Sequence, residues 1–167
     1  MQATVLNSIK GIQHDFGTYD EPKSLFVNQN WSERARKKQI HGTKILVATK
    51  DVANFVDADG VYTTKKNLLL PVVNADCYPL LFSRKDGNAI AALHVGWRGA
   101  LEGIIYELRD LLEEHNHNTA DWVVAIGPGA KACCYQVSTA IINEFSNRYS
   151  LSVNDISPQR RMLDLSV

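Results

Sequence analysis

Apolar positions along the chain fall into short runs that are separated by turn-forming residues. Runs of four to eight apolar or β-branched residues bounded by such turns are typical of β-strands. The pattern predicts strands at Lys44–Thr49, Leu68–Asn74, Pro79–Phe82, Ala89–Val95 and Trp122–Ile126, with a last short one at Met162–Leu165. An Asp-Gly pair lies between the third and fourth of these runs, so we expect those two strands to form a hairpin.

Two longer stretches show the three- and four-residue spacing of amphipathic helices. The first, Gly99–Glu114, predicts a helix of about four turns, because its leucines and isoleucines recur on one face. The second begins after Ser138, a residue type that caps helix N-termini, and places Ile141, Ile142, Phe145 and Tyr149 on one face. Strands thus alternate with few helices. We predict an α+β fold with α/β-like character, in which residues 1–167 form a single domain of mixed β-sheets flanked by helices.

Two local features modify this pattern. Pro71 lies inside the Leu68–Asn74 run, which favours an edge position or a bulge because proline has no amide hydrogen for a strand ladder. The sequence DADG at Asp57–Gly60 is typical of a turn, and we interpret Asp57 and Asp59 as turn residues.

The composition is that of an ordinary globular protein, with 45% hydrophobic and 22% charged residues. Lys plus Arg equals Asp plus Glu at 18 each, so no overall charge favours nucleic acid or an anionic membrane. The first residues lack the pattern of a signal peptide, and no apolar run reaches the about 18 residues of a membrane span. We therefore expect a cytosolic protein. The odd number of cysteines, three, favours reduced thiols over disulfides.

Three side chains that are good ligands for borderline metals lie at turns of the chain, namely His41, Cys77 and His94. Two imidazoles and one thiolate suit zinc, and three protein ligands leave a fourth position for water or substrate. The spacing is not a known zinc signature, so buried histidines and a buried free cysteine remain an alternative. A thiolate nucleophile at Cys77 with His94 as its base, as in a cysteine hydrolase, is another.

Arg98 follows the strand that ends near His94, in the sequence HVGWRG, and stands at the start of the predicted long helix. Free amides and the helix dipole favour anions at such a position, so Arg98 and Gly99 are candidates to bind phosphate. Stacking of Arg98 on Trp97, or pairing with a carboxylate, is an equally good interpretation of the sequence.

Five motifs that follow one another along the chain indicate a resemblance to a known family. They are HG at His41, DADG at Asp57–Gly60, NADCYPLLF at Asn74–Phe82, HVGWRGALEGI at His94–Ile104, and IGPGAKACCYQV at Ile126–Val137. Together they resemble the YfiH-type family, whose members are also called multicopper polyphenol oxidases, laccase-domain proteins and purine nucleoside phosphorylases. The resemblance implies mixed sheets flanked by helices, related to toxin-like cysteine hydrolases, and implies that His41, Cys77 and His94 bind the metal.

The family names imply two activities: copper-dependent oxidation of phenols, or zinc-dependent phosphorolysis of adenosine, inosine and methylthioadenosine with adenosine deamination. A multicopper site calls for many histidines, whereas this chain has five and only two lie in the motifs. We therefore expect a zinc enzyme, with copper as the alternative, acting on a purine nucleoside and phosphate. Arg98 would hold the phosphate, and Asp76 is a candidate to move protons.

The chain departs from the family pattern at three places, one of which is a segment before His41 that is shorter than usual. Gln136 stands where family members usually have a glutamate, and glutamine cannot act as a general base. The chain also ends near Leu163–Leu165, where family members continue, so we expect a domain shortened at its C-terminus. An unpaired edge strand would favour a homodimer over a monomer. A shortened, catalytically weak protein that binds metal or nucleoside is therefore a third hypothesis.

Overall fold

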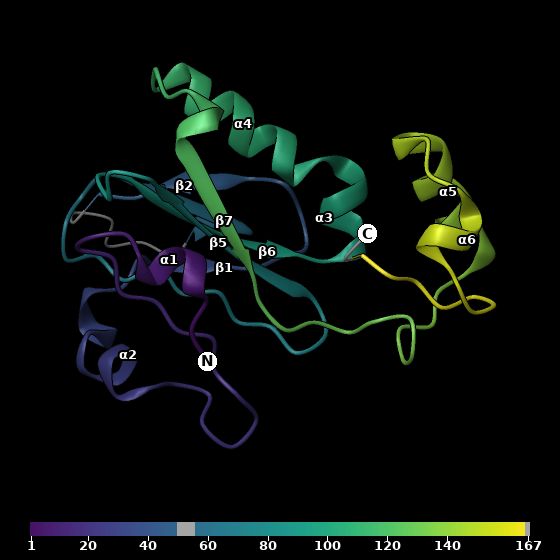
Figure 1. Ribbon diagram of the computed structural model, residues 1–167, viewed down its shortest axis with the longest axis horizontal. Coiled ribbons are helices and arrows are strands. Elements are labelled where there is room, and N and C mark those ends of the chain that lie inside the picture. Colours follow the sequence, from purple (N-terminus) through teal and green to yellow (C-terminus); the bar gives the residue numbers. More distant parts are fainter. Residues whose placement is uncertain (50–55, 166–167) are drawn as a thin grey trace.

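The computed structural model describes residues 1–49 and 56–165, and its centre is a five-stranded mixed sheet (Figure 1). The strands of this sheet are β2 (Ile45–Val47), β4 (Gly60–Thr63), β6 (Ile90–Val95), β5 (Tyr78–Arg84) and β7 (Trp122–Ile126), in their spatial order. Only β2 and β4 are parallel, and the other neighbours are antiparallel. Two short parallel strands, β1 (Lys37–Lys38) and β3 (Val56–Asp57), form a separate small sheet. The predicted α+β fold is confirmed.

The hairpin of β5 and β6 is the part of the sheet that the sequence predicts most closely. The two strands pair over six residues, from Tyr78 opposite Val95 to Ser83 opposite Ile90. The turn between them contains Gly87, whose φ of 73° lies in the left-handed region that glycine adopts without strain. Within this register Pro79 lies opposite His94, so the residue before β5 and the end of β6 come together at one edge of the sheet.

The predicted long helix Gly99–Glu114 is wrong as a single element. It is divided into α3 (Trp97–Glu102) and α4 (Ile104–Glu114). Gly103 lies between them with a φ of 96°, a left-handed conformation that ends the first helix and redirects the chain. The apolar spacing continues across this break, but Leu101 of α3 packs in a cluster with Phe145, whereas Leu108 of α4 packs in the cluster on the sheet. In the described part of the chain, no helix has the length and apolar character needed to cross a membrane.

Separate apolar clusters cover the two faces of the sheet, because successive residues of a strand point to opposite sides. The helix α4 lies over one face (Figure 1). On this face Tyr62 and Leu93 pack in one cluster with Ile104 and Leu108. Val61 faces the other side, which is covered by the N-terminal segment and the chain around Leu68–Val72. The N-terminal segment carries α1 (Thr4–Asn7) and α2 (Leu25–Gln29), followed by a 3-10 turn at Trp31–Glu33.

The predicted strand Leu68–Asn74 is wrong, because the segment joins the sheet nowhere along its length. Its backbone pairs at Leu69 alone, in an isolated bridge: the amide of Leu69 donates to Glu33 O, and its carbonyl oxygen accepts from Ala35 N. Leu68, Leu70 and Val72 instead pack down on the face of the sheet that Val61 occupies. Pro71 has no amide hydrogen to contribute to a ladder, which accounts for an extended segment that covers a sheet rather than extending it.

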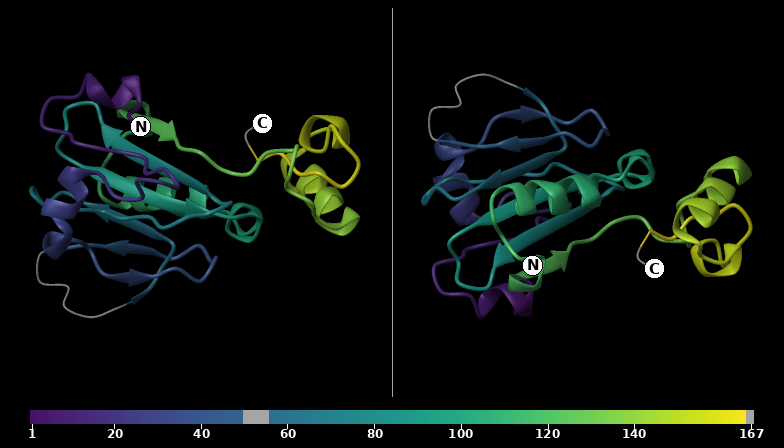
Figure 2. Two further views of the ribbon diagram at one scale, coloured as in Figure 1. Left: turned by 90° about the horizontal axis from the view of Figure 1, so that it is seen from below. Right: turned by 90° about the horizontal axis from the view of Figure 1, so that it is seen from above.

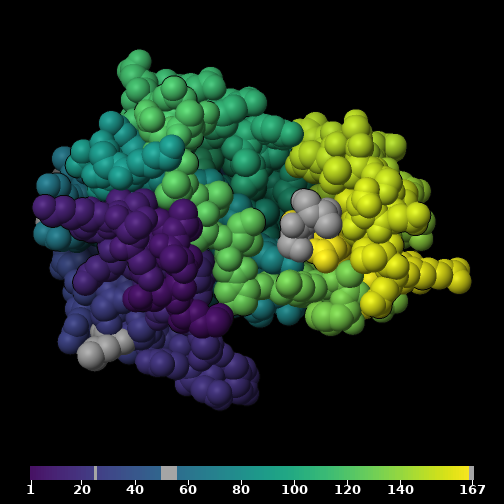
Figure 3. Space-filling view, in the orientation of Figure 1, coloured from purple at the N-terminus to yellow at the C-terminus, as the bar shows by residue number. Residues whose placement is uncertain are grey.

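The C-terminal part forms a small lobe made of α5 (Thr139–Tyr149) and α6 (Val153–Ile156). Figure 2 shows the lobe at one end of the molecule, joined to the sheet by extended segments, and Figure 3 shows its atoms against those near α3. Ser138 caps α5 by accepting a hydrogen bond from Ile141 N, as predicted. The predicted strand Met162–Leu165 is wrong. Only isolated bridges form at Met162, while Leu163 is fully buried in the core of the lobe.

A buried histidine in the N-terminal segment predicts a pH dependence of stability. His14 is 7% exposed, and its Nε2 accepts a hydrogen bond of 2.7 Å from Ala3 N. Burial lowers the pKa of His14 below 6.5, although the charge of Asp15 opposes this. The unfolded chain therefore takes up a proton first, so the contribution of His14 is complete above pH 6.5 and is lost as the pH falls toward its folded pKa.

We expect His14→Gln to flatten the loss of stability between about pH 7 and 5, because glutamine offers an acceptor that does not titrate in this range. Urea denaturation of both proteins at several pH values measures the effect. Equal slopes of unfolding free energy against pH would show that His14 does not titrate as described.

Candidate metal centre

The three predicted ligands come from three separate segments that meet at one edge of the sheet. His94 is the fifth residue of β6, Cys77 immediately precedes β5, and His41 lies four residues before β2. The β5–β6 register brings the first two together, since Cys77 is next but one to Pro79, which lies opposite His94. The parallel pairing of β2 with β4 brings the His41 segment to the same edge.

The side chains of His41, Cys77 and His94 each offer a ligand atom, and these atoms lie within 4.8 Å of one another. The two imidazole rings meet edge to face, with centroids 4.8 Å apart. Ligands of a tetrahedral zinc ion lie about 3.3–3.6 Å from each other, so small side-chain movements would complete the geometry. The donor set fits a metal, and among residues 1–49 and 56–165 it is the one such cluster found.

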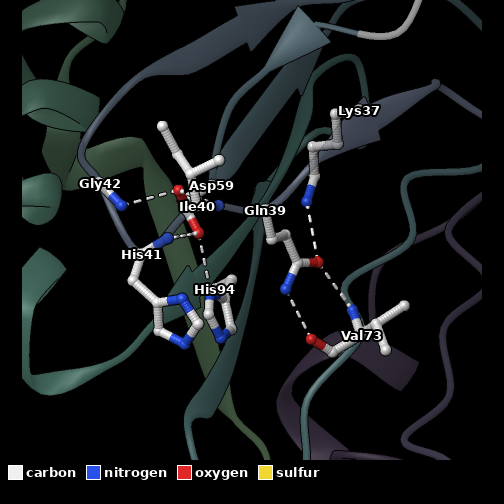
Figure 4. A network of polar contacts seen from close by, with 8 residues as sticks. All are labelled: Lys37, Gln39, Ile40, His41, Gly42, Asp59, Val73 and His94. Atoms are coloured by element: carbon white, nitrogen blue, oxygen red, sulfur yellow. Dashed lines mark hydrogen bonds and ion pairs between the residues drawn. The ribbon is translucent and has the colours of Figure 1, made fainter.

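Asp59 joins two of the three ligand-bearing segments (Figure 4). Its carboxylate is fully buried and accepts hydrogen bonds from the backbone amides of Ile40, His41 and Gly42 at 2.8–3.1 Å. Oδ1 also lies 2.8 Å from Nδ1 of His94. Burial by itself would raise the pKa of Asp59, but these hydrogen bonds, led by that of His94, hold the pKa below its usual value. Asp59 is therefore an ionised anchor for both histidines.

The contact with Asp59 determines which nitrogen of His94 faces the metal. A carboxylate only accepts, so Nδ1 of His94 carries the proton, and Nε2 is left with a free lone pair. Burial lowers the pKa of His94, against the raising influence of Asp59, which favours the neutral form that coordinates metals. This carboxylate–histidine arrangement is the one that orients metal-binding histidines in many proteins.

The backbone around the cluster is shaped to bring the ligands close. His41 has a φ of 60°, an uncommon left-handed conformation for a residue with a side chain. The amides of His41 and of its two neighbours donate hydrogen bonds to Asp59, and these bonds hold His41 in that conformation. Gly96 faces the other two segments. A Cβ atom added to Gly96 would lie 2.8 Å from Cys77 Sγ and 3.2 Å from His41 Cδ2. The missing side chain of Gly96 therefore makes room for two ligands.

The environment of Cys77 disfavours the alternative of a free thiolate nucleophile. Burial raises the pKa of the metal-free Cys77 thiol, and the charges of Asp76 and Asp59 raise it further. Nucleophilic cysteines are activated by the opposite shift, which a neighbouring cation or a protonated histidine provides. Here His94 is hydrogen-bonded to Asp59, and its lowered pKa favours the neutral imidazole, so His94 provides no positive charge to stabilise a thiolate. Coordination to a metal ion would instead deprotonate Cys77.

Arg98 and Gly99, the predicted phosphate-binding residues, differ in their exposure to solvent. Arg98 is exposed on α3, and its guanidinium carbon lies 5.5 Å from the centroid of the Trp97 ring, in line with the stacking alternative. Gly99 is buried, and a Cβ on it would lie 2.9 Å from the carbonyl oxygen of Gly42. With six residues, α3 is shorter than the helix on which the anion site was predicted.

Asp76 is exposed beside Cys77 and contributes to a cleft of about 1340 Å³. The cleft is also lined by Pro128–Ala130, whereas none of His41, Cys77 and His94 lines it. Two hydrogen bonds hold these loops together, from Ala130 N to Asp76 O at 2.7 Å and from Asn74 Nδ2 to Pro128 O at 3.3 Å. The loops of the NADC and IGPG motifs therefore form one wall beside the cluster.

Two residues of the site were not identified from the sequence. Asp59 does lie in the bend between β3 and β4, in line with the turn sequence. Its carboxylate, however, accepts hydrogen bonds from the amides of residues 40–42 and from His94 rather than from amides of its own turn. Gln39 lies two residues before His41 and bonds to both main-chain groups of Val73. Both act through contacts between distant segments, for which a single sequence carries no local signal.

Comparison with known proteins places the chain in a family. Residues 22–167 match the model of the family described as multi-copper polyphenol oxidoreductase laccase. The chain belongs to this family. All three candidate ligands, together with Asp59 and Gly96, lie within the matched residues. The resemblance drawn from the five motifs is confirmed.

Individual relatives support the family assignment. A purine nucleoside phosphorylase of Rickettsia conorii is 33% identical over 76% of this chain and 54% of its own length. One of Rickettsia prowazekii is 30% identical over 98% of this chain and 64% of its own. The crystal structure of the hypothetical protein YfiH of Bacillus licheniformis matches with a TM-score of 0.70 at 26% identity, covering 80% of this chain and 55% of that one. The chain thus spans between half and two thirds of the length of each of these relatives.

Proposed function

We propose that this protein is a zinc-dependent purine nucleoside phosphorylase that also deaminates adenosine. The observation that carries the proposal is the cluster of His41, Cys77 and His94, whose histidines are both anchored by Asp59. Relatives named purine nucleoside phosphorylase, at 30–33% identity, support the substrate class. Adenosine, inosine and methylthioadenosine are the nucleosides we expect it to accept, with inorganic phosphate as the second substrate.

The donor set supports zinc over a multicopper centre. Two imidazoles and a thiolate in a compact cluster suit one zinc ion with a fourth position open. The same three ligands also suit a single copper ion, but reduction of oxygen by a multicopper enzyme needs further copper sites. When bound, zinc would act as a Lewis acid that polarises an oxygen atom of water or substrate. Copper-dependent oxidation of polyphenols, the activity in the family's description, is the second candidate.

The residues of the chain have separate tasks in the proposed reactions. In phosphorolysis a phosphate oxygen forms a bond to C1′ of the ribose while the bond from C1′ to the purine nitrogen breaks. The exposed Arg98 guanidinium would hold the phosphate, together with the adjacent Gly99 in the same turn of α3. Asp76, exposed beside Cys77, would move the proton to the leaving purine. In deamination the oxygen of water adds to C6 of adenine and ammonia leaves, with the same carboxylate moving the protons.

Metal analysis combined with turnover tests the proposal. We expect about one zinc per chain, and formation of hypoxanthine and ribose 1-phosphate from inosine and phosphate. Cys77→Ala should lose the zinc and the turnover, because one of three ligands is gone. Cys133→Ala is the matched control, since Cys133 is an exposed free thiol outside the cluster, and it should keep both.

Other results would identify the alternatives. Several coppers per chain with oxidation of phenols would replace the proposal by the second candidate. One zinc per chain with no purine base from inosine, and no inosine from adenosine, would indicate a protein that binds metal without turnover.

A further inference from the structure

Cys133 and Cys134 form a pair of exposed thiols that the proposed reactions do not use. Both lie in one tight turn, in which the amides of Cys134 and Tyr135 each donate to the carbonyl oxygen of Lys131 at 2.9 Å. Within this turn the Cys133 thiol donates to Cys134 Sγ at 3.4 Å, and the Cys134 thiol donates to Lys131 O at 3.6 Å. The two sulfur atoms therefore lie side by side on the surface before any ligand binds.

A direct disulfide between these neighbours is disfavoured by the backbone. Adjacent Cα atoms are about 3.8 Å apart across a trans peptide bond, whereas the Cα atoms of ordinary disulfides lie about 4.4–6.8 Å apart. A disulfide would also draw the sulfur atoms well inside 3.4 Å, against the hydrogen bonds that hold the turn to Lys131 O. An atom that bridges the two sulfur atoms would leave the turn intact.

The separation of the sulfur atoms indicates what kind of atom could bridge them. With bonds of about 2.3 Å, as in metal thiolates, sulfur atoms 3.4 Å apart subtend an angle of about 95° at the bridging atom. A linear two-coordinate ion needs the sulfur atoms about 4.6 Å apart, and a tetrahedral ion needs them about 3.8 Å apart. An angle this close to a right angle is typical of pyramidal three-coordinate arsenic(III), which binds sulfur strongly.

The surroundings of the pair also favour a centre that needs only two protein ligands. Among residues 1–49 and 56–165, three or more metal-binding side chains come together only at the metal centre, so no third protein ligand joins this pair. The hydrogen bond to Cys134 raises the pKa of Cys133, which favours the protonated thiol at neutral pH. Arsenic(III) oxides react with thiols in this form, and the third substituent of the arsenic has room in the solvent because both cysteines are exposed.

We propose that Cys133 and Cys134 form a dithiol site that chelates trivalent arsenic and is separate from the metal centre. With an organic arsine oxide, two As–S bonds form and the As=O bond breaks. The oxygen leaves as water with the two thiol protons, so arsenic stays trivalent and no oxidant is needed. Cys134 also lines the cleft to which Asp76 contributes, so the adduct would occupy part of the wall of that cleft. The site depends neither on the proposed function nor on the identity of the metal.

Titration of the full chain with phenylarsine oxide, in the presence of the monothiol glutathione, tests the proposal by intact-protein mass spectrometry. We expect one phenylarsenic group per chain, which an excess of glutathione leaves in place and an excess of dithiothreitol removes. Cys133→Ser and Cys134→Ser should each weaken binding at least about 100-fold, because a single thiol loses the chelate effect. Cys77→Ala is the control, since it removes the remaining cysteine, and it should keep the adduct.

A measurement on the wild-type protein keeps the test valid if a variant fails to fold. The bound arsenical should protect Cys133 and Cys134 together from iodoacetamide, as read by peptide mapping. Alkylation of both thiols in the presence of the arsenical, or an adduct that glutathione removes, would overturn the proposal. Loss of the adduct in Cys77→Ala, with its retention in both serine variants, would also overturn it, because the arsenic would then lie at the metal centre.

Discussion

Asp59→Asn is expected to destabilise the metal-free protein by about 3 kcal/mol or more and to weaken zinc binding about 10- to 100-fold. The reason lies in the arrangement of donors around the carboxylate. Oδ1 accepts from His41 N and His94 Nδ1, and Oδ2 accepts from Ile40 N and Gly42 N. An asparagine has one NH2 group, and in either orientation it would face two donors in a fully buried position.

The effects on stability and on metal binding have different physical origins. Stability falls because two buried amide or imidazole donors lose their acceptor. Zinc affinity falls because His94 loses the carboxylate that fixes its tautomer and ring orientation, and because the left-handed backbone at His41 loses its support. Urea denaturation in the presence of a chelator measures the first effect, and competition with a chromophoric zinc chelator measures the second.

Asp57→Asn is the matched control, since Asp57 belongs to the same DADG sequence but is exposed in β3. It should change stability by less than about 0.5 kcal/mol and leave zinc affinity unaltered. If Asp59→Asn behaved like Asp57→Asn in both measurements, the carboxylate would have no role as an anchor.

The contrast between these two aspartates illustrates what the sequence can predict. Both have the residue type and the neighbours of a turn, and both lie at or next to a bend. Burial of one and exposure of the other follow from the parallel pairing of β2 with β4, which brings residues 40–42 over Asp59 and not over Asp57. No pattern within a few residues of the DADG sequence records that contact between distant segments.

The parts that were predicted correctly depend on local chemistry. The β5–β6 hairpin follows from two apolar runs and an Asp-Gly turn, and it places Cys77 near His94 without knowledge of the remaining fold. Where prediction was wrong, a tertiary or single-residue effect overrode the pattern. Gly103 divides a helix whose apolar spacing runs through it, and Leu68–Asn74 uses its alternating apolar residues to cover a sheet instead of joining one.

Gly96→Ala is expected to weaken zinc binding at least about tenfold and to lower stability by about 1–3 kcal/mol. The backbone of Gly96, with φ of −89° and ψ of 169°, is extended and open to any residue, so the change introduces no conformational strain. Its whole effect comes from the added methyl group. That group would lie 2.8 Å from Cys77 Sγ and 3.2 Å from His41 Cδ2, so one or both ligands must move.

Gly42→Ala provides the control at the same site. A Cβ on Gly42 has no neighbour nearer than 3.7 Å, which is ordinary van der Waals contact, so zinc affinity should stay within about twofold of the wild type. Zinc competition and denaturation of both variants test the comparison. If Gly96→Ala bound zinc as tightly as Gly42→Ala, Cys77 and His41 would not approach each other around Gly96 as the structure shows. A selective loss in Gly96→Ala would mean that the glycine between His94 and Trp97 is required by the metal cluster and not by the turn into α3.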